Sequence, residues 1–95
     1  MKPLIVLAIV LLCLSYGLRA RNIILDWDAP NAQGITGYSV YRIYRSGNSV
    51  YCKRSIVRTA PTFADVVPDG KTYFYFVTVL YGNQESAPSN AIEVK

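Results

Sequence analysis

The chain contains no histidine, only two cysteines and a single methionine among its 95 residues. Without an imidazole it can form neither a Ser-His-Asp nor a Cys-His catalytic arrangement, and the commonest nitrogen ligand for metals is missing. Charged residues make up 17% of the chain and hydrophobic residues 52%, which is too apolar for a disordered protein. The sequence therefore predicts one small folded domain that is not an enzyme and has no cofactor or metal site.

The N-terminus differs from the rest, because residues 4–14 form an unbroken apolar run after a single lysine. Such a run followed by small residues is typical of a secretory signal peptide, with cleavage after Gly17 or after Ala20. We therefore expect residues 1–20 to direct export and residues 21–95 to form the folded domain, which is secreted, periplasmic or at the cell surface. The alternative is a retained membrane anchor over residues 3–18, although its sixteen positions are fewer than the roughly 20 that span a bilayer as a helix.

After residue 20, apolar and polar residues alternate as they do in β-strands, and no stretch follows helical spacing. Segments rich in glycine, proline, asparagine and serine separate these alternating stretches. The expected strands cover residues 23–28, 38–43, 50–53, 62–66, 73–79 and 91–94. This pattern predicts an all-β protein, an antiparallel immunoglobulin-like β-sandwich of about six strands with almost no helix.

Four segments, in order, resemble those of a fibronectin type III domain of the secreted bacterial kind. They are LDWDAP (25–30), ITGYSVYR (35–42), GKTYFYFV (70–77) and GNQESAPSN (82–90). The resemblance implies that Trp27 and Tyr38 are structural residues. It also places Tyr73 at the tyrosine corner, where the hydroxyl bonds to the backbone just upstream.

The resemblance is incomplete at the N-terminal side. The family has seven strands, and its first strand precedes the tryptophan-bearing one. After cleavage at Ala20 only Arg21 and Asn22 would remain in that place. We therefore expect the first strand to be missing and the edge of the strand at 23–28 to be open. A partner or a second copy could complete such an edge by strand addition. Alternatively, in an uncleaved chain the segment 15–22 could supply a short first strand itself.

Alternation also places large apolar side chains on the outer face of the sandwich. If Tyr38, Tyr73 and Tyr75 point into the core, their sequence neighbours point away from it. The side chains expected to face outward are Tyr41, Ile43, Phe74 and Phe76. Because a contiguous exposed apolar patch usually marks an interface, these residues predict a protein partner or self-assembly. The alternative is that loops or the segment near residue 50 cover them.

The basic residues are unevenly distributed, since no acid lies between Asp28 and Asp65. That window holds Arg42, Arg45, Lys53, Arg54 and Arg58. We expect Arg42 and Arg45 to form a polar rim beside the outward aromatic residues. The same basic side could hold an acidic glycan, an envelope surface or lipid headgroups. Nucleic acid is not expected, because the aromatic residues are not interleaved as stacking platforms. Alternatively, the charges only prevent edge-to-edge aggregation.

Cys52 and the aspartates give weaker indications of a disulfide and of a calcium site. Cys52 could form an intermolecular disulfide in an oxidising compartment, but we expect a half-buried filler on a short strand. Asp26 and Asp28 share a strand face and could bind calcium with Asp65 or Asp69. Because calcium needs six or more oxygen ligands, solvated acids are the favoured interpretation.

These observations together predict a non-enzymatic, extracytoplasmic module for protein–protein binding or structural assembly. The alternative function is a carbohydrate- or envelope-binding module that uses the basic side. Contact with a membrane is expected only if the N-terminal segment is retained.

Overall fold

The computed structural model describes residues 6–15, 18–31, 33–68 and 70–95, which contain eight strands and no helix. The strands are β1 (Val6–Ser15), β2 (Leu18–Trp27), β3 (Gly37–Ser46), β4 (Ser49–Val57), β5 (Thr62–Pro68), β6 (Tyr73–Tyr81), β7 (Gln84–Glu85) and β8 (Ile92–Val94). No helix capable of crossing a membrane occurs among the described residues. The all-β prediction is confirmed.

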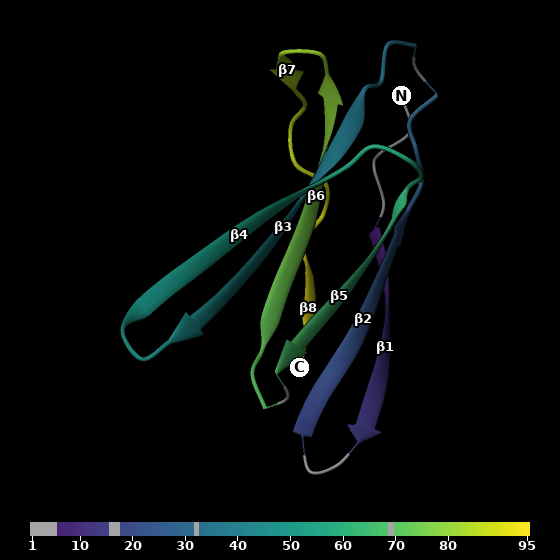
Figure 1. The fold of residues 1–95 in the computed structure, drawn as a ribbon. Helices are drawn as coiled ribbons and strands as arrows, with labels where there is room; N and C mark the ends of the chain where they lie inside the picture. The colour runs from purple at the N-terminus through teal and green to yellow at the C-terminus, as the bar shows by residue number, and fades with distance from the viewer. Residues whose placement is uncertain (1–5, 16–17, 32, 69) are drawn as a thin grey trace.

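The strands form two antiparallel sheets that pack face to face (Figure 1). One sheet has the order β1-β2-β5. In the other, β4, β3 and β6 are neighbours, and both β7 and β8 pair with the far side of β6. The buried core contains side chains from both sheets, so the molecule is an antiparallel β-sandwich.

Two tight turns set the register of the second sheet. Gly47 links β3 to β4 with φ 61, and Gly82 links β6 to β7 with φ 60. In both turns the next residue is asparagine, which also tolerates a left-handed backbone. Each turn therefore closes a hairpin at the place where the sequence predicts a break.

The first strand lies where the sequence analysis expected an open edge. β1 pairs antiparallel with β2 along its whole length, from Val6 opposite Trp27 to Ser15 opposite Leu18. In the full chain β1 takes the place of the first strand and covers the edge of β2, so the expectation of a missing first strand concerns only a chain cut after Ala20. An open edge on β2 applies only to a chain without its first twenty residues. The proposed cut after Gly17 lies outside the described residues.

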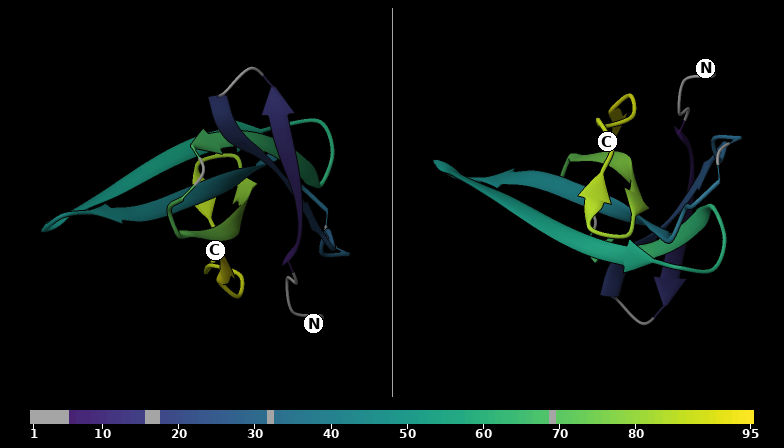
Figure 2. Two further views of the ribbon diagram at one scale, coloured as in Figure 1. Left: turned by 90° about the horizontal axis from the view of Figure 1, so that it is seen from below. Right: turned by 90° about the horizontal axis from the view of Figure 1, so that it is seen from above.

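β4 is longer than the sequence analysis expected, because it extends over nine residues rather than 50–53. It pairs with β3 from Ser46 opposite Ser49 to Tyr38 opposite Val57. The tip of this hairpin projects beyond the rest of the sandwich (Figure 2). β7 was expected as part of a turn, and it forms a short strand instead.

The three residues assigned structural roles all lie in the core. Trp27 packs edge-on against Tyr38, with ring centroids 5.2 Å apart. Tyr73 is 2% exposed, and its hydroxyl donates a hydrogen bond to the carbonyl of Pro68 at 3.2 Å. This is the upstream backbone contact that the tyrosine-corner assignment predicts.

Candidate binding surface

The outer face of the second sheet brings together the four apolar residues that the sequence placed outside. Tyr41 lies opposite Phe76, and Ile43 lies opposite Phe74, on the neighbouring strands β3 and β6. The rings of Tyr41 and Phe76 stack with centroids 4.6 Å apart and an interplanar angle of 12°. Phe74 is 42% exposed, and the other three side chains are half-buried. We call these four residues the aromatic face.

β4 extends this apolar surface toward the edge of the sheet. Cys52 lies opposite Ile43, and Val50 lies opposite Arg45. Val50 is 61% exposed and Ile56 is 46% exposed. Cys52 is also exposed, so the expectation of a half-buried filler is wrong. Ile56 was not predicted because the strand was expected to end at residue 53, and Val50, although inside that strand, was not singled out. Their even spacing places both on the same strand face as Cys52.

Polar contacts hold Tyr41 in place at one end of the aromatic face. Glu85 accepts hydrogen bonds from the Tyr41 hydroxyl at 2.5 Å and from the Thr78 hydroxyl at 2.6 Å. These bonds, the one from Thr78 first, lower the pKa of Glu85, and the bond to Glu85 raises the pKa of Tyr41. Arg54 donates to the Ser39 hydroxyl at 2.9 Å, and its guanidinium lies 5.9 Å from the Tyr41 ring centroid. The tyrosine ring is therefore oriented before any partner binds.

Arg42 does not belong to the rim of this surface. It points between the sheets, where its Nη1 lies 3.0 and 2.9 Å from the two carboxylate oxygens of Asp65 on β5. Tyr75 donates a further hydrogen bond to Asp65 Oδ2 at 2.8 Å. Burial, followed by this bond, raises the pKa of Tyr75. The rim assignment is wrong because Arg42 shares the inward face of β3 with Tyr38 and Val40.

Arg21 is a second inward-pointing cation that the sequence analysis did not single out. It is 2% exposed, and its guanidinium donates to the carbonyls of Lys95 and Lys71, both at 2.5 Å. The guanidinium also lies 5.6 Å from the Tyr73 ring centroid. Arg21 therefore ties β2 to the end of the chain and to the segment before β6. Its only sequence signal is a place in the alternation with Ile23 and Leu25.

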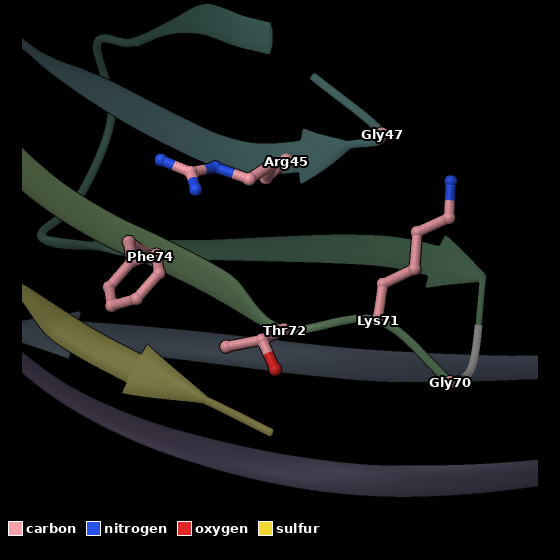
Figure 3. A pocket seen from close by; sticks show the side chains of 6 residues that line it. All are labelled: Arg45, Gly47, Gly70, Lys71, Thr72 and Phe74. Atoms are coloured by element: carbon pink, nitrogen blue, oxygen red, sulfur yellow. The ribbon is translucent and has the colours of Figure 1, made fainter. Parts of the chain in front are cut away.

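Arg45 does lie beside the aromatic face, at the hairpin end of the sheet. It lines an open pocket of about 620 Å³, whose other lining residues are Gly47, Gly70, Lys71, Thr72 and Phe74. Figure 3 shows that Arg45 and Phe74 project on the same side of the sheet. The Lys71 ammonium lies 5.1 Å from the Tyr44 ring centroid. Two cations, one hydroxyl and one ring thus surround a space that opens to solvent.

The acids considered for calcium do not come together. No group of three His, Cys, Asp or Glu residues that could hold a metal occurs among the described residues. Asp65 points inward to Arg42, while Asp28 is exposed at the end of β2. Asp69 lies outside the described residues.

Comparison with known proteins gives a structural likeness. No family model matches the chain, and no curated protein matches it. A solved structure described as "Myokine structure" superposes with a TM-score of 0.64 over 90% of this chain and 89% of that chain. The two share the β-sandwich fold. Their sequence identity is 15%, so the likeness concerns the fold alone.

Proposed function

We propose that the chain is a fibronectin type III-like module that binds protein outside the cytoplasm and has no catalytic role. The observation that carries this proposal is the aromatic face. The solvated face of an antiparallel sheet is normally polar. Here Tyr41, Ile43, Phe74 and Phe76 form continuous apolar rows on two neighbouring strands.

The chemistry of this face suits a protein partner. Tyrosine and phenylalanine are enriched in the centres of protein interfaces, where they bury much area at little cost in side-chain entropy. Glu85 and the Phe76 ring already fix Tyr41, which further reduces the entropy lost on binding. A preorganised aromatic patch of this kind favours binding of a specific partner over non-specific hydrophobic association.

Membership of the fibronectin type III family is part of the same proposal. It is supported by the two-sheet strand order, by the Tyr73 contact to Pro68 and by the fold likeness. Export is supported by the apolar run at residues 4–14. Intact-mass measurement of the protein recovered outside the cytoplasm tests export and gives the position of any cut.

The test of the binding function compares two sets of surface variants. Phe74→Ser with Phe76→Ser removes the centre of the aromatic face, while Val66→Ser removes a side chain that is 64% exposed on the other sheet. The wild-type protein, immobilised, should retain a protein from the extracytoplasmic fraction, or it should self-associate in size-exclusion light scattering. We expect the double variant to lose this association and Val66→Ser to keep it, in high salt as well. Equal association by the wild type and both variants, or a monomer that retains nothing, would refute the proposal.

The pocket beside Arg45 supports a second candidate function, the binding of an anionic glycan. Arg45 and Lys71 supply positive charge, Thr72 supplies a hydroxyl and Phe74 supplies a flat apolar ring. A sulfated oligosaccharide should bind in low salt and dissociate in high salt, because exposed charges are screened. Arg45→Ala with Lys71→Ala should abolish this binding, whereas Arg58→Ala should leave it intact. Binding that persists in the double variant would exclude the pocket.

A further inference from the structure

β4 forms an open edge of the second sheet. Among the described residues its one strand partner is β3, and seven of its nine residues are exposed. The hairpin also carries β4 away from the body of the sandwich (Figure 2). In the part of the chain that the structure describes, β4 is therefore a long edge of the second sheet that another strand could reach.

The register of the hairpin shows which backbone groups of β4 are available. A two-residue turn at Gly47 makes Ser46 and Ser49 a pair that exchanges hydrogen bonds, and such pairs recur at every second residue. Tyr51, Lys53 and Ser55 therefore bond to β3. The residues whose N–H and C=O groups point away from β3 are Val50, Cys52, Arg54 and Ile56.

The side chains of β4 suit strand pairing. The strand contains no proline and no glycine, and it exposes Val50, Tyr51 and Ile56 to 61%, 48% and 46%. β-Branched and aromatic residues favour extended pairing. Val50, Cys52 and Ile56 also continue the outer face toward Ile43, so a strand added at this edge would widen the same surface.

Charge decides which strand can occupy the edge. Lys53 and Arg54 lie at the middle of β4, and the chain has no acid between Asp28 and Asp65. When two copies pair antiparallel so that all four outward-facing residues bond, Lys53 lies directly opposite Lys53 of the other copy. Like charges placed opposite each other destabilise a sheet. An acidic strand would instead place carboxylates beside both cations.

We propose that β4 binds an extended, acidic segment of a protein partner by strand addition. This inference rests on the proposed protein-binding function and adds both the place of contact and the chemistry of the partner. Backbone hydrogen bonds to Val50, Cys52, Arg54 and Ile56 hold the segment. Carboxylates beside Lys53 and Arg54 select it, and apolar residues at the other positions cover Val50 and Ile56.

The probe is a synthetic peptide of nine residues, the length of β4, with two adjacent glutamates at its centre and valine at the other positions, so that one carboxylate lies on each face of the added strand. A matched peptide carries lysine in place of glutamate. Two further peptides carry N-methyl groups on the odd or on the even residues of the acidic sequence. Binding is measured by fluorescence anisotropy with the full chain at low salt.

We expect the acidic peptide to bind at least about tenfold more tightly than the lysine peptide. One N-methylated peptide should lose binding and the other should keep it, because only every second residue bonds to β4. Equal binding of the acidic and lysine peptides, equal binding of the two N-methylated peptides, or no binding of any peptide would each overturn the inference.

Variants locate the site. Cys52→Pro removes an N–H that points away from β3, so β4 should stay paired while peptide binding falls. Cys52→Ala is the control and should bind as the wild type does. Lys53→Gln should weaken the acidic peptide severalfold. If Cys52→Pro does not fold, the pair of N-methylated peptides still decides the question on the wild-type chain.

The outcome separates this inference from the proposed function. Phe74→Ser with Phe76→Ser should leave peptide binding within about twofold of wild type while it abolishes association through the aromatic face. Loss of that association without any peptide binding overturns strand addition alone. If only one of the two N-methylated peptides binds, but the Phe74→Ser and Phe76→Ser changes have no effect on association with a protein partner, the aromatic-face function alone is overturned. A dimer that Cys52→Pro dissociates would identify a second copy as the occupant and overturn the acidic partner.

Discussion

Asp65 is the acceptor at the centre of the polar cluster between the sheets, and its replacement by alanine should cost the protein much of its stability. The carboxylate accepts two contacts from Arg42 and one from Tyr75, all within 3.0 Å. In Asp65→Ala the guanidinium keeps its charge with no counter-ion, and the Tyr75 hydroxyl loses its acceptor in a side chain that is 0% exposed. The Tyr75 hydroxyl cannot reach bulk water without opening the sandwich, and the Arg42 side chain is only partly exposed.

The magnitude follows from the burial of the pair. Removing one partner from a fully buried ion pair costs about 3–5 kcal/mol. The side chains of Arg42 and Asp65 retain 18% and 12% of their exposure, so solvent screens part of the charge and reduces this cost. We therefore expect Asp65→Ala to lower the free energy of unfolding by about 3 kcal/mol, which is a large part of the roughly 5–15 kcal/mol that stabilises a native domain.

Urea unfolding of a double-mutant cycle measures this interaction. The cycle consists of the wild type, Asp65→Ala, Arg42→Met and the double variant. Because the double variant contains no unpaired charge, its loss should be smaller than the sum of the single losses by about 2 kcal/mol. For a slope of about 1–3 kcal/mol per molar urea, Asp65→Ala should lower the midpoint by roughly 1–3 M.

Two results would refute this argument. A loss below about 1 kcal/mol in Asp65→Ala would mean that solvent reaches Arg42 freely, as it does in a surface ion pair. Strict additivity in the cycle would mean that the two side chains do not interact in solution. Either result would return Arg42 to the surface, where the sequence analysis had placed it.

Three further perturbations test other parts of the structure. Burial and the bond to Asp65 raise the pKa of Tyr75. The stabilisation that Tyr75 provides is therefore complete below about pH 10 and is lost at higher pH. Urea midpoints of wild type and Tyr75→Phe should differ least in alkali. Because hydrogen bonds lower the pKa of Glu85, its contribution is present above about pH 4.5 and is lost as the pH falls, so Glu85→Gln should flatten the acid side of the stability profile. A Cβ at Gly37 would lie 2.9 Å from the carbonyl oxygen of Val57, so Gly37→Ala should lower the unfolding free energy by about 1–3 kcal/mol in calorimetry, and an unchanged melting temperature would contradict the close approach.

Alternation along single strands predicted much of the fold and of the candidate surface. The period of two assigned inner and outer faces on β3 and β6, so it placed Tyr41, Ile43, Phe74 and Phe76 together before any pairing was known. Turn residues located the hairpin breaks in the same way. Both signals depend only on residues that are close together in the sequence, so they can be read from a single chain.

Features that depend on distant partners were not predictable in this way. Arg42 alternates in phase with the inward-facing Tyr38 and Val40, yet it was expected at the rim, because its counter-ion comes from β5 and the sequence does not show that Asp65 faces it. The extent of β4 was missed because its polar centre is held by pairing with β3. β1 was missed because an unbroken apolar run has no period of two, and the same run is typical of a signal peptide.

The pairing of β2 on both sides imposes an order of events on any processing near its start. In the folded chain Ala20 and Arg21 lie opposite Cys13 and Leu12 of β1, and opposite Pro68 and Val67 of β5. A peptidase needs an accessible, locally unfolded backbone at the bond that it cuts. The Ala20–Arg21 bond is therefore a substrate only before the sandwich closes. If the chain is exported as proposed, translocation and folding would compete for the same ten residues of β1, and the faster process would decide whether the product is the folded full chain or a shorter one with a free edge on β2.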